Sequence, residues 1–299
     1  MCALLSGAVI NIGLDPLFIY TFHMGVAGAA IATAISQFIS TLVYLSYVLR
    51  KKSAFTFSIK AFAPTKEIFT EILKIGIPTL TFQLLTSLSI ALINRASNGY
   101  GDAVIAGMGA VTRITSMGTL VVFGFLKGFQ PIAGFSYGAK NFRRLRQSIK
   151  TSILCSTVFC IFAGLLMILF SPQIISQFAN GNEEMLLIGQ KSLRANGFSF
   201  FLFSFYTVYF SLFLALGKGT AGFILGACRQ GICFVPVILL LPRILGINGI
   251  LYAQPIADIL SVIVTVFMAL DLHKKLSIEE RGLQAQITIH TSAEQSRNK

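Results

Sequence analysis

Lys127 to Gln147 reads KGFQPIAGFSYGAKNFRRLRQ, and this stretch joins a break in an apolar run, a turn of small residues and a basic cluster. Proline removes one backbone hydrogen-bond donor and wedges the preceding turn, so a helix that crosses Gln130-Pro131 is predicted to kink. In lipid, a neighbouring helix, a side chain or water must satisfy the carbonyl that the kink frees. The break indicates either a moving part beside a cavity or an ordinary packing kink, and we take Pro131 as a candidate hinge.

The composition of the whole chain is that of a membrane protein. Hydrophobic residues make up 55% of the 299 residues, charged residues make up only 12%, and the mean hydropathy is +0.77. A soluble domain carries about a quarter charged residues, so we predict an all-α polytopic membrane protein with the lipid bilayer as a partner. The formal net charge of +13 would also suit a nucleic-acid-binding protein. Because the positive side chains gather at the ends of apolar runs, no nucleic-acid partner is expected.

Eight apolar runs are long enough to be membrane-spanning helices, which need about 20 predominantly apolar residues. They cover approximately residues 2–20, 25–49, 72–98, 102–138, 148–170, 194–216, 220–241 and 247–271. The residues after Leu272 are polar, and we predict that they are disordered beyond Arg281.

The distribution of Lys and Arg predicts the orientation of these runs. If Met1 lies in the cytoplasm and the segments alternate, most of the 24 Lys and Arg residues fall on the cytoplasmic side, including Lys218 and Arg229. The outer side holds only Arg95, Lys191, Arg194 and Arg243. The positive-inside rule therefore predicts that both ends of a multi-pass cell-membrane protein lie in the cytoplasm, the membrane being the inner one in a bacterium.

Residues that could bind a metal or perform catalysis are not gathered within the predicted spans. The odd number of cysteines and the lack of CxxC spacing suggest neither a disulfide framework nor a metal site, and we expect small buried apolar residues at Cys2, Cys155, Cys160, Cys228 and Cys233. A membrane-bound enzyme would need clustered His, Asp, Glu or Ser and Lys within the spans, but the histidines lie at span ends or in the tail. We therefore expect no enzyme and no cofactor.

An internal repeat relates the two ends of the chain. GVAGAAIATAISQ, which begins at Gly25, resembles GINGILYAQPIAD, which begins at Gly246, and Gly28 then aligns with Gly249. Gly-x-x-Gly allows a helix to begin close against its neighbour. Each copy opens a helix that is predicted to run from the outside to the inside and to end in a basic cluster, which strengthens the match.

The repeat divides the chain into parts of unequal size. Residues 1–50 would form the last two helices of a first lobe, 51–65 a cytoplasmic linker, 66–276 a six-helix second lobe, and 277–299 a polar cytoplasmic tail. If the two lobes are equal, about four helices and roughly 150 residues are expected upstream of Met1, so the chain would be N-terminally truncated.

Three stretches resemble the multidrug and toxic compound extrusion (MATE) family. They are LKIGIPTLTFQLLTSL from Leu73, GFQPIAGFSYGAKN from Gly128, and the segment LDP…GVAGAAIAT from Leu14 to Thr33. The middle stretch is the most specific, since Gln-Pro followed by a Gly-Ala turn recurs in each half of the family. The resemblance covers nearly the whole chain to about residue 276 and implies two six-helix lobes in a V around a central cleft.

The same resemblance implies a secondary active multidrug exporter that moves amphipathic organic cations out of the cell, as a monomer, in exchange for Na⁺ or H⁺. The alternative is a related flippase of lipid-linked saccharides or polysaccharide precursors, which shares the two-lobe fold. A flippase for pyrophosphate headgroups would be favoured by a strongly cationic cleft. Only Arg113 and, near the inner end, Lys127 are assigned to the interior of a span, so the cleft is not predicted to be strongly cationic.

A polar stripe on the predicted helix 72–98 indicates a cleft-lining face. Its members fall on one side at helical spacing: Thr79, Gln83, Thr86, Ser87, Asn94 and Ser97. Ser and Thr commonly join helices in membranes, but Gln and Asn need partners or water in lipid. The stripe therefore either lines the cleft or packs against a helix, and we take Gln83, Thr86 and Asn94 as candidate substrate contacts.

Further candidates come from polar side chains deep in other spans. Arg113 lies well inside a predicted helix, where a charge is costly and normally faces a cavity or a partner, and Gln130 stands at the Pro131 break. Tyr206 and Tyr209 carry hydroxyl groups deep in an aromatic helix and could receive organic cations. Asp258 is a candidate ion-coupling residue, although a structural hydrogen bond to a neighbouring helix explains it equally well.

One departure from the family concerns ion coupling. Several branches carry a membrane-embedded carboxylate on the first helix of the second lobe and another on its fourth. The resemblance puts Thr86 near the first of these positions and Tyr206 near the second, and neither side chain can bind Na⁺ or a proton as a carboxylate would. Coupling would then use an acidic residue of the first lobe or Asp258, so the coupling ion stays open.

Overall fold

The computed structural model describes residues 2–50, 65–179 and 181–297. The chain divides into two compact units, Met1–Thr65 and Lys66–Lys299. All regular elements in the described ranges are helical. This agrees with the all-α class that the composition predicts.

The first unit is a pair of packed helices. It contains α1 (Cys2–Pro16), a π-helical turn η1 (Leu17–Thr21) and α2 (Gly25–Leu49). Gly25 adopts a φ of +56°, a conformation that glycine reaches without steric cost, and the chain turns there into α2. A side chain on Gly28 would lie 3.0 Å from Phe18, so the absence of one lets α2 pack closely against the preceding turn.

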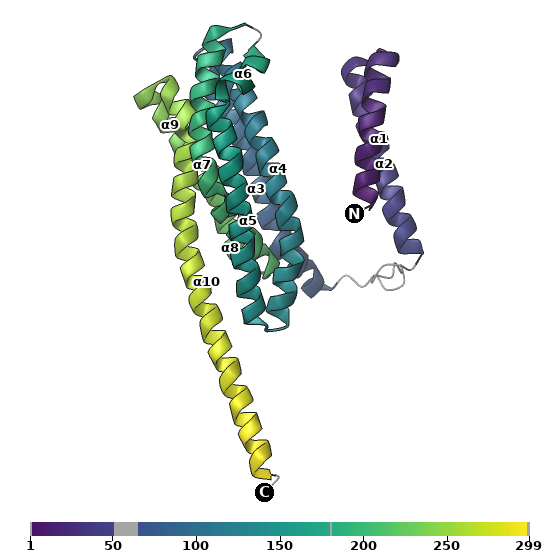
Figure 1. Ribbon diagram of the computed structural model, residues 1–299, viewed down its shortest axis with the longest axis vertical. Helices are drawn as coiled ribbons and strands as arrows, with labels where there is room; N and C mark the ends of the chain where they lie inside the picture. The colour runs from purple at the N-terminus through teal and green to yellow at the C-terminus, as the bar shows by residue number, and fades with distance from the viewer. Residues whose placement is uncertain (1, 51–64, 180, 298–299) are drawn as a thin grey trace. The chain divides into compact units, whose positions relative to one another are not determined.

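The second unit is a bundle of six long helical segments. In order it contains α3 (Lys66–Asn98), α4 (Asp102–Gly138), α5 (Phe142–Leu169), the short α6 (Ser171–Ala179), α7 (Glu183–Ala215), a segment formed by α8 (Gly219–Ala227), η3 (Cys228–Ile232) and α9 (Phe234–Leu245), and α10 (Ile247–Arg297). In Figure 1 these segments run side by side, and α10 extends beyond the bundle toward the C-terminus.

Seven helices in the described ranges are long and apolar enough to cross a membrane, six of them in the second unit. The eighth predicted span, 2–20, corresponds to a shorter apolar helical stretch, Leu5–Thr21. Several helices begin earlier than their apolar runs, as α7 does at Glu183 instead of 194, because backbone hydrogen bonding continues through polar flanking turns. The predicted disorder beyond Arg281 is wrong for the same reason, since α10 continues as a helix to Arg297.

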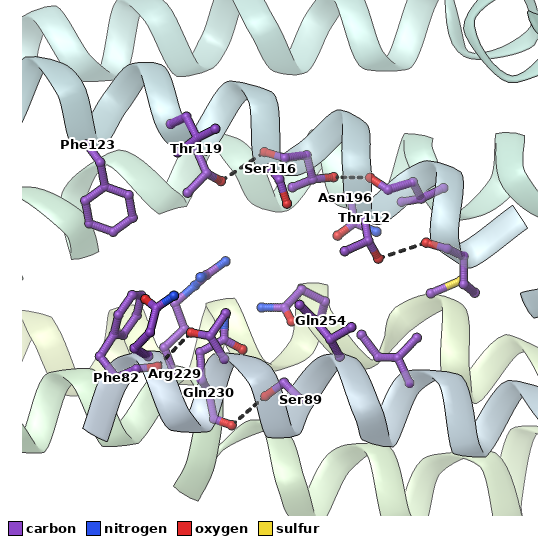
Figure 2. A pocket seen from close by; sticks show the side chains of 18 residues that line it. Phe82, Ser89, Thr112, Ser116, Thr119, Phe123, Asn196, Arg229, Gln230 and Gln254 are labelled. Atoms are coloured by element: carbon purple, nitrogen blue, oxygen red, sulfur yellow. Dashed lines mark hydrogen bonds between the residues drawn. The ribbon is translucent and has the colours of Figure 1, made fainter. Parts of the chain in front are cut away.

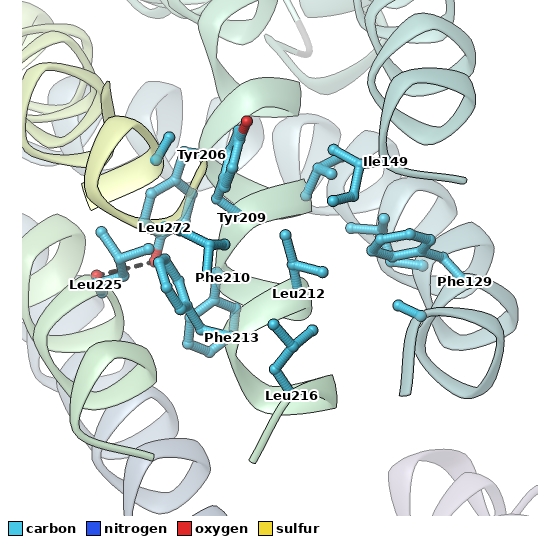
Figure 3. Close-up of a cluster of buried hydrophobic side chains, with 14 of the residues drawn as sticks. Phe129, Ile149, Tyr206, Tyr209, Phe210, Leu212, Phe213, Leu216, Leu225 and Leu272 are labelled. Carbon is cyan, nitrogen blue, oxygen red and sulfur yellow. Dashed lines mark hydrogen bonds between the residues drawn. The ribbon is translucent and has the colours of Figure 1, made fainter. Parts of the chain in front are cut away.

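The centre of the second unit is α7. In its most apolar window 67% of the residues are buried, against 11% in α3, so α7 is the helix around which the others pack. Aromatic rings of α7 stack within this core, Phe200 on Phe203 and Tyr206 on Phe210. Figure 3 shows Tyr206, Phe210 and Phe213 between the surrounding helices.

Two glycines allow the backbones of α5 and α7 to come into contact. A side chain on Gly164 would lie 2.6 Å from the carbonyl oxygen of Gly197, and one on Gly197 would lie 2.9 Å from that of Gly164. Small residues at such a crossing give close van der Waals packing, which is the main attraction available between helices in lipid.

The stretch Lys127 to Gln147 forms the end of α4, a tight turn and the start of α5. The helix α4 runs unbroken through Pro131, and the turn that follows it contains Lys140 at a φ of +54°. The side chain of Asn141 caps α5 by accepting a hydrogen bond from the backbone N–H of Arg144 at 3.0 Å. Arg146 then forms an ion pair with Glu280 of α10 at 2.8 Å, so the basic cluster also joins two helices.

The two glycines of the predicted repeat share a backbone feature. Gly246 has a φ of +58°, nearly that of its predicted counterpart Gly25, and each glycine lies directly at the start of the following helix. The cysteine prediction is confirmed for Cys160, Cys228 and Cys233, which are buried and free, but it is wrong for Cys155, which is exposed on the outside of α5. The side chain of Cys2 lies outside the described residues.

Candidate substrate cavity in the second unit

A cavity of about 340 Å³ opens between α3 and α4 within the second unit. Residues of α7, η3 and α10 complete its lining. Figure 2 shows Phe123, Thr119, Ser116 and Thr112 on one wall, Phe82 and Ser89 on the other, and Arg229 and Gln254 between them. The lining combines two aromatic rings with hydroxyl and amide groups, which is the mixture expected of a small-molecule site.

The α4 wall presents hydrogen-bond acceptors. Thr112, Thr115 and Thr119 follow one another at spacings of three and four residues, so their hydroxyl groups share one face of the helix. Each hydroxyl donates to the carbonyl four residues earlier, at 2.8, 2.9 and 2.9 Å respectively. Their protons are thereby committed, and the oxygen lone pairs are left for a ligand that donates.

The α3 wall contains two of the predicted contacts, Gln83 and Thr86. Thr86 donates to the carbonyl of Phe82 at 2.7 Å, while the side chain of Gln83 is exposed at the cavity. Ser89, one turn further along, donates to the carbonyl of Gln230 at 2.8 Å and so joins α3 to η3.

Arg229, which lines the cavity, forms a buried ion pair that joins η3 to α10. The Nε atom of Arg229 donates to Oδ1 of Asp258 at 2.8 Å, and the two residues are 7% and 4% exposed. Gln254 donates to the same carboxylate oxygen at 2.9 Å, and Ser199 of α7 donates to Oδ2 at 3.1 Å. Three donors therefore stabilise the Asp258 carboxylate, as a buried charge requires.

The π-helical turn η3 positions Arg229. Its wider turn is closed by a hydrogen bond from the N–H of Cys233 to the carbonyl of Cys228 at 2.8 Å. Gly231 lies against α3, where an added side chain would approach Leu85 to 2.9 Å. Single π-helical turns inside α-helices are frequent at functional sites, and this one brings the arginine to the cavity.

Arg229 is a cavity-lining residue that sequence reasoning assigned wrongly. It was counted among the cytoplasmic cations, but it lies inside the span Gly219–Leu245 and is buried. Arg113 is therefore not the one arginine within a span of the second unit. A signal was present, because Arg229 falls well inside the apolar run 220–241, where a charge needs a partner.

The structure does not bring the other predicted contacts to this cavity. Arg113 and Asn94 are exposed and Gln130 is half-buried, each outside the cavity lining. The hydroxyl group of Tyr206 donates to the carbonyl of Leu225 at 3.1 Å, and that of Tyr209 is 2.9 Å from Nε2 of His273. Both tyrosines are buried and join α7 to other helices.

Comparison with known proteins gives the family. Residues 78–240 match the family model described as MatE. The chain belongs to the MatE family. The match includes α4, α7 and the Arg229 turn, so every residue that lines the cavity except Gln254 lies in the part of the chain that the family model covers. The resemblance to MATE proteins is thereby confirmed, as is the expectation that the chain is not an enzyme.

The relatives are multidrug export proteins. The multidrug export protein MepA of Staphylococcus saprophyticus is 29% identical over 291 residues, which are 95% of this chain and 62% of the relative. MepA of Staphylococcus haemolyticus is 28% identical over 289 residues, with the same coverage. A solved outward-facing structure of a multidrug resistance MATE family transporter of the MOP superfamily superposes with a TM-score of 0.85 at 24% identity, covering 92% of this chain and 62% of that one. This MatE-family chain thus spans 62% of the length of these relatives.

Within the described residues, no group of three or more His, Cys, Asp or Glu side chains could hold a metal ion. Arg229 is the one charged residue among those that line the cavity in this part of the chain. The chemistry of the cavity is therefore that of hydrogen bonding, aromatic contact and a single compensated cation.

Proposed function

We propose that the protein carrying this chain is a secondary active multidrug exporter that exchanges Na⁺ or H⁺ for amphipathic organic cations. The observation that carries the proposal is the cavity between α3 and α4, whose polar and aromatic lining suits molecules with both characters. Family membership and the names of the relatives support it. The protein would act as a monomer in the cell membrane.

Two rings and the threonine oxygens would receive the organic cation. Phe82 and Phe123 are in edge contact, with centroids 6.0 Å apart, and both line the cavity. Aromatic faces attract cations, and oxygen lone pairs accept hydrogen bonds from protonated amines. Gln83 and Thr86 would orient the substrate without supplying charge, which suits a weakly selective site.

Asp258 remains our candidate for ion coupling, with a condition that its geometry imposes. Its carboxylate already has Arg229 as counterion, so Na⁺ or H⁺ would have to compete with this internal cation. Binding of the ion at Asp258 would therefore release Arg229 toward the cavity and couple ion entry to the substrate site. The other proposal is coupling through an acidic residue of a first lobe.

The flippase alternative receives no support from the cavity. A lipid pyrophosphate would need several uncompensated cations, whereas the cavity offers Arg229, which is paired with Asp258. We therefore keep the exporter as the single proposed function.

The test is dye export from cells that lack their own efflux pumps. Cells that express the protein should extrude ethidium and a second cationic dye faster than vector controls, and collapse of the coupling gradient should stop this. Sodium replacement and a protonophore, applied separately, identify the ion. Equal dye retention in expressing and control cells, at verified membrane expression, would refute the proposal.

A further inference from the structure

Arg229 has hydrogen-bond donors that the protein does not use. A guanidinium group carries five N–H donors, and only the Nε–H of Arg229 is bonded, to Asp258 at 2.8 Å. Among the described residues, no acceptor is bonded to its Nη1 or Nη2 atoms. The side chain is 8% exposed and lines the cavity, so these donors are desolvated by protein except where the cavity reaches them.

The surrounding groups hold this guanidinium in one orientation. Asp258 binds its Nε side, and Gln254 and Ser199 in turn hold the carboxylate. The Phe203 ring lies 4.7 Å from the guanidinium carbon and the Tyr206 ring 5.7 Å from it. Because the group is fixed by an ion pair and by two aromatic rings, its unused Nη donors are preorganised for a ligand instead of being free to turn away.

We propose that the cavity contains a carboxylate subsite at the Nη atoms of Arg229, and that zwitterionic aromatic molecules bind there. Two N–H groups in a planar fork match the two oxygen atoms of a carboxylate, which a spherical cation such as an ammonium group cannot do. This deepens the proposed exporter function and rests on it only for the entry of substrates into the cavity.

The charge balance of the cavity explains why a zwitterion fits better than a simple anion. Arg229 and Asp258 together carry no net charge, so a lone anion would add an uncompensated charge beside Asp258. A zwitterion brings its own positive group. The oxygen lone pairs of Thr112 and Thr115 on the opposite wall accept hydrogen bonds from that group, while Phe82 and Phe123 contact the aromatic part.

The test compares two probes that differ only in the carboxylate. Dansyl-lysine carries an aromatic fluorophore and a zwitterionic amino-acid head, and its methyl ester keeps the fluorophore and the ammonium group. Both are titrated by fluorescence into the purified full chain in detergent, at a pH where both amines stay protonated. A charge-assisted hydrogen bond predicts about tenfold tighter binding of the acid than of the ester.

Variants assign this preference to Arg229. R229Q/D258N removes both charges together, so no unpaired charge is buried, and the acid-to-ester preference should fall to about one. Arg229→Lys keeps the charge but loses the planar fork, and it should reduce the preference several-fold. Arg194→Gln is the matched control, because it removes an arginine of α7 that bonds Ser171 outside the cavity; the preference should persist.

Equal binding of acid and ester by the wild-type chain, or binding of neither, would overturn the subsite. So would a preference that persists in a folded R229Q/D258N variant, since the carboxylate would then bind elsewhere. Size-exclusion profiles establish folding, and if the double variant does not fold, the Arg229→Lys comparison carries the test. Dye export without an acid preference would refute this inference alone. An acid preference without dye export would refute the proposed function and leave the subsite standing.

Discussion

One residue, Arg229, sets the chemistry of the cavity through contacts that are remote in sequence. Its partner Asp258 lies on α10, and the ring beneath it, Phe203, lies on α7. An arginine in an apolar helix is tolerated only when paired, and here the pairing also leaves part of the guanidinium unused. The same side chain therefore stabilises the bundle and offers a polar contact to a ligand.

The ion pair makes a prediction about stability. Asp258→Asn or Arg229→Gln alone leaves a buried charge without its partner and should lower the free energy of unfolding by about 3–5 kcal/mol. R229Q/D258N, which removes both charges, should lose less than the sum of the two single changes. Thermal unfolding of the purified proteins in detergent measures this, and additive losses would contradict a coupled pair.

Gln83 makes a prediction about substrate contact. It lies at the cavity wall without a charge, so Gln83→Leu should weaken dye export several-fold while leaving insertion intact, since leucine enters a membrane at least as well as glutamine. Export of several chemically different dyes is measured at matched membrane expression.

Unequal losses between dyes would indicate direct contact at Gln83, and equal losses would indicate impaired conformational cycling. The matched control is Thr70→Val, on the same helix but outside the cavity lining, where the hydroxyl group donates only to Lys66 of its own helix. Unchanged export of every dye by Gln83→Leu would remove this residue from the site.

At the level of elements, the second unit depends on how closely its helices approach α7. The Gly164 and Gly197 backbones meet there, and the close approach brings α5 against the helix that carries most of the core. Since lipid is as apolar as leucine, such packing contributes attraction that hydrophobic burial cannot provide between helices in a bilayer.

The crossing of α5 and α7 predicts a strong steric effect. Gly197→Leu would force the backbones apart and should lower both the yield of folded protein and its unfolding temperature, because overpacking of this kind costs roughly 1–3 kcal/mol or more. Gly124→Leu is the control, since nothing lies within 4 Å of a side chain placed there. Thermal unfolding of both variants should separate them; similar curves would contradict the close crossing.

Pro131 makes a prediction about movement. The helix α4 carries the cavity wall and continues unbroken past Pro131, where the missing backbone donor weakens one turn. If this turn bends during transport, Pro131→Ala should preserve expression but slow dye export. Pro172→Ala, in the short helix α6, serves as the comparison, and a Pro131→Ala variant with normal export rates would assign this proline to packing.

For the whole molecule, we expect a two-lobe plan in which α2 and α10 are counterparts, since the glycines that open them have similar φ angles and the second unit contains six candidate spans. The distribution of Lys and Arg at the helix ends predicts how the bundle is oriented in the membrane, which its packing alone does not indicate. Both ends are expected in the cytoplasm.

Orientation is tested by labelling from outside. In a protein whose cysteines, including the exposed Cys155, have been replaced, Asn182→Cys should react with an impermeant maleimide in intact cells, and Arg144→Cys should react only after lysis. Both positions are exposed in the structure, so a difference in labelling would not result from burial of one of them. The reverse pattern would show that the positive-inside assignment is wrong.

The sequence alone determined the membrane class, the approximate spans and the family, and it predicted the repeat. Each of these rests on a local pattern: run length, charge at helix ends, or a motif such as Gln130-Pro131. Helical spacing also placed Gln83 and Thr86 on one polar face of α3. Such patterns can be recognised in the sequence because they do not depend on which helix packs against which.

Only the tertiary structure decided which polar side chains meet. Arg113 and Thr112 are neighbours in sequence, yet only Thr112 lines the cavity, because one residue turns the helix by about 100°. Arg229 pairs with Asp258 of α10 and is oriented by Phe203 of α7, and a local sequence pattern identifies neither contact. In lipid both faces of a helix are apolar, so the spacing of apolar residues is a weak guide to the buried face. The role of each charged residue therefore depends on which other helix it contacts.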